Sequence, residues 1–253
     1  MKKQTVLEIL IEHYPDITKD ALYARVLCGE VFVDGERARD PKQRVNAEAA
    51  IGFEKKEFVS RGGTKLQYAL EQTGLHIKGK TIIDAGSSTG GFTDCLLQNG
   101  ASHVHAVDVG TNQIAYQLRI DSRVTVHENT NILDLEDISP VPDLATADIS
   151  FRSIRGVATH LISLTKERTA LVLVKPQFEQ EKDKPGFRGV LSDPADIRAT
   201  LSRVIQNLWI EEAFPEMVVR SPITGRKGNV EFFMLLSAAK TQSIPELQLI
   251  IDR

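Results

Sequence analysis

The sequence has few cysteines, no long apolar run and no large excess of charge of either sign. Its two cysteines, Cys28 and Cys95, are too few for a disulfide framework and lack the spacing of metal ligands. Both lie among apolar residues, so we expect two buried free thiols and no metal site. The longest apolar runs, such as residues 170–174, are far too short to span a bilayer.

The N-terminus and the overall composition exclude further classes of protein. Glu8, Glu12 and His13 interrupt the apolar residues near the start, which excludes a signal peptide. The net charge is −3, so any nucleic-acid binding must depend on local basic patches. A chain of 253 residues can form one or two domains with a substantial core. We therefore expect a soluble, cytoplasmic protein that does not act on membranes.

Residues 1–57 have the pattern of a small α+β unit. Apolar residues recur at helical spacing from Val6, and Thr18 is placed to cap a second helix that Gly29 ends. A strand at 31–33, the turn at 34–35 and a last strand at 51–53 complete the unit. The basic residues of the stretch between these strands are Arg37, Arg39, Lys42 and Arg44.

The phrase Gly-Glu-Val-Phe-Val-Asp-Gly at residues 29–35 resembles the alpha-L RNA-binding domain. That resemblance implies that the basic residues of this unit contact RNA. The usual Arg-Leu-Asp opening of such domains is replaced by Gln4-Thr5-Val6, and acidic side chains balance much of the basic charge. A scaffold unit without RNA contact therefore remains the alternative.

From residue 80 the sequence alternates between strand and helix patterns, which is typical of a parallel sheet covered by helices on both faces. Residues 58–79 precede it as a linker and a helix whose apolar face packs on this domain. The pattern predicts an α/β, Rossmann-like domain over 80–240, a mobile loop over 179–193 and a tail over 241–253. The predicted strands are 81–85, 103–108, 123–127, 143–148, 169–175, 213–220 and 230–238, and the predicted helices are 91–99, 112–119, 153–164 and 195–208.

Residues 84–94, Asp-Ala-Gly-Ser-Ser-Thr-Gly-Gly-Phe-Thr-Asp, form a glycine turn between a strand and a helix. Gly86, Gly90 and Gly91 lack a Cβ, which lets a ligand approach the backbone. The G-x-x-x-G-G spacing differs from the dinucleotide motif, and Asp84 would repel a pyrophosphate but suit a cationic amino group. The turn resembles motif I of S-adenosylmethionine methyltransferases, in particular FtsJ-like 2′-O-ribose methyltransferases. A glycine loop that serves only as a turn is the alternative.

Other candidate cofactor residues lie beyond the ends of the next strands. Asp108 is placed to bind a ribose hydroxyl, although such residues also cap helices. Asn131, in the segment 128–131, is our first candidate for reading the adenine edge. The cofactor set implied by the resemblance is Asp84, Gly86, Ser88, Gly90, Gly91, Phe92, Asp108, Asn131 and Asp148, with Phe92 packing beside the methionine part of the cofactor.

Asp148 and Lys175 each close a predicted parallel strand. Because ligands in open α/β sheets bind beyond the carboxyl ends of the strands, we expect both side chains in one crevice. A partly desolvated lysine at that position suits a general base. A simple buried Asp–Lys pair is the alternative interpretation.

Several segments together resemble the TlyA family, historically labelled hemolysin A: residues 60–65, 84–94, 106–110, 148–151, 175–179, 221–225 and 228–233. The resemblance implies an N-terminal RNA-binding domain joined to an FtsJ-like enzyme that methylates ribose 2′-hydroxyls of cytidines in ribosomal RNA. The Lys-Asp-Lys-Glu tetrad of FtsJ-like enzymes would be Lys65, Asp148, Lys175 and Glu231. RNA contacts outside the first unit would come from Arg61, Arg220, Arg226 and Lys227.

Two other classes of function compete with this hypothesis. The historical label suggests a membrane-active cytolysin, which the absence of a spanning segment or a basic amphipathic helix disfavours. An RNA-binding ribosome assembly factor without catalysis is disfavoured by the intact tetrad. A nicotinamide dehydrogenase is disfavoured by the glycine spacing.

Overall fold

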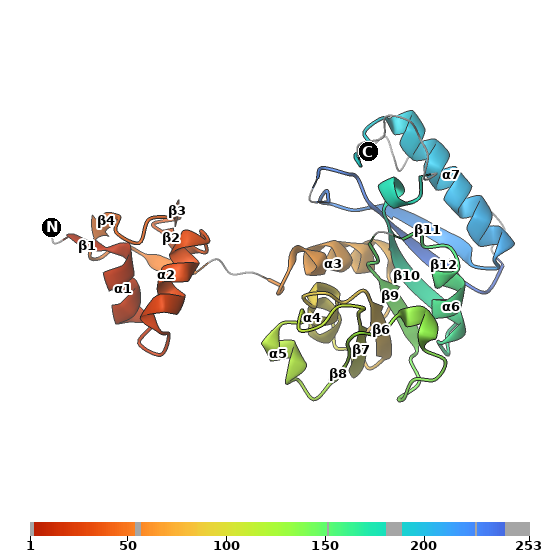
Figure 1. The fold of residues 1–253 in the computed structure, drawn as a ribbon, viewed down its shortest axis with the longest axis horizontal. Coiled ribbons are helices and arrows are strands. Elements are labelled where there is room, and N and C mark those ends of the chain that lie inside the picture. Colours follow the sequence, from red (N-terminus) through yellow and green to blue (C-terminus); the bar gives the residue numbers. More distant parts are fainter. Residues whose placement is uncertain (1–2, 54–56, 151, 181–188, 226, 241–253) are drawn as a thin grey trace. The chain divides into compact units, whose positions relative to one another are not determined.

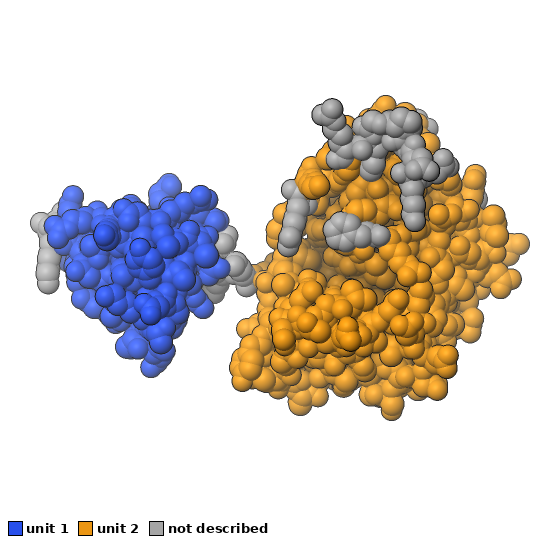
Figure 2. Space-filling model, in the orientation of Figure 1, with its two compact units in different colours: residues 1–56 blue, residues 57–253 orange. Residues whose placement is uncertain are grey.

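The computed structural model describes residues 3–53, 57–150, 152–180, 189–225 and 227–240 (Figure 1). The chain divides into two compact units, residues 1–56 and 57–253 (Figure 2). The predicted tail over 241–253 and most of the predicted loop over 179–193 lie outside the described residues.

The described residues of the first unit form two helices and five short strands. Thr18 caps α2 (Lys19–Leu27), as the sequence predicted. Thr5 and Glu8 form a capping box, which was not predicted, at the start of helix α1 (Val6–His13). Strands β3 (Glu36–Ala38), β2 (Val31–Val33) and β5 (Ile51–Phe53) form one antiparallel sheet, and β1 (Lys3–Thr5) pairs with β4 (Arg44–Asn46). Apolar side chains from both helices and from β2 meet in a separate core.

Two features of this unit were not predicted correctly. Cys28 is exposed, because α2 ends at Leu27 and turns Cys28 away from the core, whereas Cys95 is buried as expected. Strands β1, β3 and β4 were missed. Their sequences, Lys-Gln-Thr, Glu-Arg-Ala and Arg-Val-Asn, are mostly polar and lack the apolar residues that mark β2 and β5.

The second unit is built on a seven-stranded sheet in the order β11-β12-β10-β9-β6-β7-β8. Strands β6 (Thr81–Ala85), β7 (His103–Val107), β8 (Val124–His127), β9 (Leu144–Ala147) and β10 (Thr169–Val174) run parallel. Strand β12 (Phe232–Ser237) runs antiparallel to β10 and to β11 (Phe214–Arg220). The predicted Rossmann-like plan with a final strand pair is confirmed.

Helices cover both faces of this sheet (Figure 1). Helices α3 (Arg61–Thr73), α4 (Gly91–Gln98) and α5 (Tyr116–Arg119) share one apolar core with the sheet. Helices α6 (Val157–Ser163) and α7 (Pro194–Ile210) share the other core. Short 3₁₀ turns η1 (Ile132–Asp134) and η2 (Pro176–Phe178) follow the ends of β8 and β10.

Two predicted helices begin later than expected. The helix expected from 112 forms only at α5, because Asn112 has a positive φ of 54° and the Ala115 N–H bonds to the Thr89 carbonyl. The helix expected from 153 begins after Gly156, whose φ is +71°. The apolar periodicity predicts a helix at both places. Tertiary hydrogen bonds from the Ala115 N–H and the Gly156 N–H hold the backbone in another conformation.

The register of the strands brings four segments together at the edge of the sheet formed by the carboxyl ends of the parallel strands. They are the segments after β6, β9 and β10 and the one before β12. Ala85 pairs with Ala147, so the glycine turn and Asp148 are neighbours, and the Asp148 N–H bonds to the Ala85 carbonyl at 2.9 Å. Val174 pairs with Phe232, so Lys175 and Glu231 leave the sheet side by side. This edge, where β6 lies between β7 and β9, is the switch point at which open α/β sheets bind ligands.

Candidate active site

The glycine turn follows β6 and leads into α4. Ser88 and Thr89 are exposed, whereas Gly90 and Gly91 are buried. The turn therefore presents its first half to a ligand, and its second half faces the protein interior.

A Cβ added at each of the three glycines would meet protein atoms, so their small size is also needed for packing. Their contact with the cofactor stays a prediction. A Cβ on Gly86 would lie 2.6 Å from the Asp148 carbonyl oxygen. One on Gly91 would meet Ser60 Oγ. Phe92 is likewise buried and stacks on Phe233 with 5.9 Å between ring centroids, so we assign it to the core. Small or apolar residues at these positions allow residues 60–63 and the backbone of Asp148 to pack on the turn.

We expect Gly90→Val to destabilise the second unit as well as to weaken cofactor binding. Gly90 has a φ of +92°, and a Cβ there would overlap Leu118. Backbone strain and overpacking each cost about 1–3 kcal/mol. Thermal unfolding should show a larger loss for Gly90→Val than for Gly74→Val, because Gly74 shares the positive φ but has open space around it. Equal losses would contradict the packing role.

Asp84 lies at the base of the turn and is fully buried. Its Oδ2 accepts a 2.6 Å hydrogen bond from Thr93, while Oδ1 has no hydrogen-bond partner among the described residues. Burial, together with the nearby Asp148, raises the pKa of Asp84 to about 7, although the Thr93 hydrogen bond opposes this shift. A cationic amino group would satisfy Oδ1 and favour the ionised form, so the site fits the methionine end of S-adenosylmethionine.

We expect Asp84→Asn to weaken cofactor binding and to raise the stability of the folded protein. The unfolded carboxyl ionises near pH 3.8 and the folded one near pH 7, so the folded state of the wild type loses stability as pH rises between those values. The asparagine variant has no such loss, and its unfolding temperature should exceed that of the wild type at pH 8 more than at pH 4. Calorimetric titration at pH 8 should show weaker binding of S-adenosylmethionine. Unchanged affinity there would contradict the assignment.

Asp108 and Asn131 both support loop backbone, and their contacts with the cofactor stay a prediction. Asp108 accepts hydrogen bonds from the Ser88 N–H at 2.8 Å and the Gly110 N–H at 2.7 Å. Asn131 Oδ1 accepts from the Leu133 N–H and caps η1. Each carboxylate oxygen of Asp108 retains lone-pair capacity for a ribose hydroxyl. Asp108 thus links the next strand to the exposed half of the turn.

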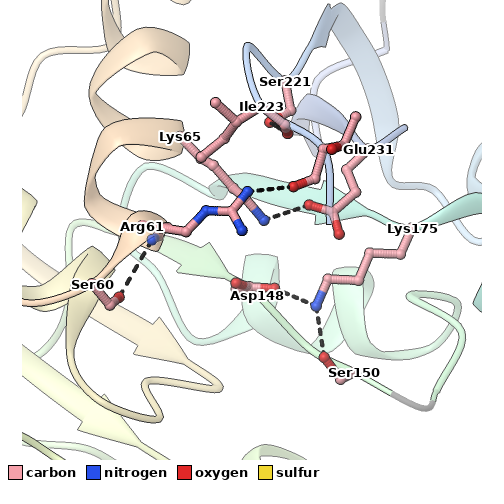
Figure 3. Close-up of polar contacts among 11 residues, drawn as sticks. Ser60, Arg61, Lys65, Asp148, Ser150, Lys175, Ser221, Ile223 and Glu231 are labelled. Carbon is pink, nitrogen blue, oxygen red and sulfur yellow. Dashed lines mark hydrogen bonds and ion pairs between the residues drawn. The ribbon is translucent and has the colours of Figure 1, made fainter. Parts of the chain in front are cut away.

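The four tetrad residues form two ion pairs at the sheet edge (Figure 3). Lys175 Nζ lies 2.5 Å from Asp148 Oδ1, and Lys65 Nζ lies 2.5 Å from Glu231 Oε2. Both lysines and Glu231 are buried. Lys65 reaches the edge from the second turn of α3, whose apolar face packs on the second unit as predicted and contacts α4 there. Four residues far apart in sequence are therefore gathered beside the glycine turn.

Ser150 is a site residue that the sequence interpretation missed. Lys175 Nζ donates a 2.6 Å hydrogen bond to Ser150 Oγ, in addition to its pairing with Asp148 (Figure 3). A serine two positions after a strand-end aspartate carries no distinctive sequence signal. Its proximity to Lys175 depends on the path of the chain after β9.

The predicted RNA-contacting residues fall into two groups. Arg37, Arg39, Lys42 and Arg44 are exposed in the first unit, with the Arg37 guanidinium over the Phe32 ring. In the second unit, Arg61 is exposed and donates a 2.7 Å hydrogen bond to the Thr224 carbonyl, so it also anchors the β11–β12 loop. Lys227 is exposed, Arg220 is half-buried at the end of β11, and Arg226 lies outside the described residues.

The described residues contain no group of three or more His, Cys, Asp or Glu side chains that could hold a metal. Within the same part of the chain, no helix has both the length and the apolar character needed to cross a membrane.

Comparison with known proteins agrees with this geometry. The family model for FtsJ-like methyltransferases matches residues 58–238. The 16S/23S rRNA (cytidine-2′-O)-methyltransferase TlyA of Mycobacterium tuberculosis is 40% identical over 83% of this chain and 80% of its own length. Hemolysin A of Brachyspira hyodysenteriae is 37% identical over 82% of this chain and 88% of its own length.

A solved structure covers the whole chain. It is a candidate hemolysin from Streptococcus thermophilus, with 32% identity and a TM-score of 0.74 over 100% of this chain and 94% of that one. These likenesses agree with the sheet order and with the two ion pairs beside the glycine turn. The chain belongs to the TlyA/hemolysin A group of the FtsJ-like methyltransferase family.

Proposed function

We propose that this protein methylates the ribose 2′-hydroxyl of a cytidine in ribosomal RNA. The methyl donor is S-adenosylmethionine, which supplies an electrophilic methyl group when bound. The observation that carries the proposal is the two ion pairs, Lys175–Asp148 and Lys65–Glu231, beside the glycine turn. The printed activity of the TlyA relative supports ribosomal RNA as the substrate and cytidine as the nucleotide.

Lys175 is the proposed general base. A ribose hydroxyl is a weak nucleophile at neutral pH and must lose its proton as it attacks. A neutral lysine amine has two N–H bonds and one lone pair. With Ser150 accepting one N–H and the Asp148 carboxylate beside Nζ as its ion partner, the lone pair is directed to a position on the remaining side of the amine. A 2′-hydroxyl held at that position would pass its proton to Nζ, and Asp148 would stabilise the resulting ammonium.

The Lys65–Glu231 pair has a proposed structural role. Glu231 neutralises the charge of Lys65, with 2.5 Å between Nζ and Oε2. A Cβ on Gly225 would lie 2.5 Å from Glu231 Oε1, so the β11–β12 loop packs directly on this carboxylate. We therefore propose that the pair fixes the β11–β12 loop against α3 and thereby forms the wall that holds the ribose.

RNA binding is proposed for the exposed basic residues of both units. Arg37, Arg39, Lys42 and Arg44 would neutralise phosphates through the first unit, and Arg61 and Lys227 through the second, with Arg220 and Arg226 from the same loop. Binding of this kind weakens steeply with salt, because each neutralised phosphate releases a counterion.

The proposal is tested by mapping ribose methylation. Ribosomal subunits from cells that lack this protein are incubated with the purified enzyme and labelled S-adenosylmethionine. We expect label in ribosomal RNA at a cytidine whose 3′ phosphodiester becomes resistant to alkaline cleavage, since that cleavage needs a free 2′-hydroxyl. Binding to subunits without methyl transfer would instead favour the assembly-factor alternative. Label on a base would overturn the 2′-hydroxyl assignment.

A further inference from the structure

The turn that follows β10 holds the neighbouring loop at two points. Lys175, at the start of η2, contacts Asp148 and Ser150. Glu179, at the end of η2, accepts hydrogen bonds from Ser153 Oγ at 2.5 Å and from the Ile154 N–H at 2.8 Å. The loop after β9 is thus attached to one short turn both before and after residue 151.

Glu179 is a buried carboxylate that the proposed chemistry does not use. It is 7% exposed, and burial raises its pKa, while the hydrogen bonds from Ser153 and Ile154 oppose that shift. Arg203 donates to its backbone carbonyl at 3.1 Å and fixes the turn to α7. Burial of a carboxyl group costs free energy unless hydrogen bonds compensate for the lost water. Here both side-chain contacts go to the loop that carries Ser150.

The two contacts of Lys175 do not depend on Glu179 equally. The Asp148 backbone is tied to β6 by its N–H bond to the Ala85 carbonyl. Ser150 is two residues further along and exposed, so its place depends on where the loop is held next. That next attachment is Glu179, through Ser153 and Ile154.

We propose that Glu179 is a positioning residue for methyl transfer, which places Ser150 so that Lys175 Nζ keeps a hydrogen-bond acceptor beside its ion pair with Asp148. This inference rests on the proposed function, in which Lys175 is the base. Without Ser150 the lone pair of the amine is free to rotate away from the hydroxyl, and misplacement of about 1 Å can cost roughly 10²-fold in rate.

The test compares Glu179→Ala, Glu179→Gln and Glu211→Ala. Glutamine keeps an acceptor for the Ile154 N–H and a partner for Ser153. Glu211→Ala is the matched control, because Glu211 Oε2 accepts from the Gly156 N–H and holds the far end of the same loop. We expect Glu179→Ala to lower kcat about 10²-fold with KM values for RNA and S-adenosylmethionine nearly unchanged. Glu179→Gln should recover most of that loss, and Glu211→Ala should stay near the wild type.

A second readout needs no RNA substrate. Brief acetylation with acetic anhydride, followed by mass spectrometry, measures the reactivity of Lys175 against that of Lys65. Loss of the Ser150 contact should raise Lys175 labelling several-fold in Glu179→Ala, whereas Lys65, which pairs with Glu231, should not change. If Glu179→Ala does not fold, Ser153→Ala removes one of the two contacts and should show the same changes in smaller measure.

The outcomes separate this inference from the proposed function. A wild type that transfers no methyl group to ribosomal RNA contradicts the proposed function, while the labelling of Lys175 still tests the position of Ser150. Unchanged kcat and labelling in Glu179→Ala overturn the inference. So does a rise in KM alone, or a Glu179→Gln variant as inactive as Glu179→Ala, because that result would show a role for the charge instead of for position.

Discussion

Lys175→Ala should abolish methyl transfer and leave the affinities for S-adenosylmethionine and RNA nearly unchanged. A general base acts in the transition state and contributes little to ground-state binding. General-base catalysis contributes roughly 10²–10⁴-fold in rate, and we expect a loss of that size in single-turnover assays on ribosomal subunits. Lys166→Ala is a matched control, because Lys166 also pairs with an aspartate, Asp143 at 3.0 Å, but away from the site.

Lys175→Arg distinguishes a base from a fixed positive charge. Arginine keeps the charge and can pair with Asp148, but it does not lose its proton at physiological pH. If Lys175 is the base, the arginine variant should be as inactive as the alanine variant. Substantial turnover by the arginine variant would show that Lys175 acts through its charge or by positioning the substrate.

Removal of the first unit should separate cofactor binding from activity on the ribosome. We expect a protein that begins at Glu57 to bind S-adenosylmethionine but to lose methylation of ribosomal subunits, because the exposed basic residues of the first unit are gone. The cut must leave Glu57 and Val59 in place. The Glu57 carbonyl accepts from Gln98 at 2.9 Å, and the Val59 N–H donates to Asp94 at 2.8 Å, so both hold the start of α3 on α4.

A milder form of the same test keeps the unit folded. Arg37→Glu with Arg39→Glu reverses two exposed charges, while Glu36→Lys on the same strand is the control of opposite sign. Filter binding to ribosomal RNA at several salt concentrations should show weaker affinity and a shallower salt dependence for the Arg37→Glu, Arg39→Glu protein.

Full activity of the truncated protein on subunits would show that the first unit is only a scaffold.

The sequence by itself determined the plan of the second unit. Asp84 lies near the end of its predicted strand, Asp108, Asp148 and Lys175 close theirs, and the carboxyl ends of parallel strands meet at one edge. That rule is enough to bring Asp84, Asp108, Asp148 and Lys175 together without knowledge of the packing. The caps at Thr18 and Gly29 were predictable for a similar reason, because their signals lie within one helical turn.

Only the tertiary structure decided how the site is completed. Glu231 reaches Lys65 because β12 pairs antiparallel with β10 in a single register, and Ser150 reaches Lys175 because Glu179 holds the loop after it. The glycines of the turn also pack against Asp148, Leu118 and Ser60, which their spacing in the sequence does not reveal. Patterns of neighbouring residues encode local conformation. The pairing of distant segments depends instead on the free energy of packing the whole chain, which no short stretch of sequence contains.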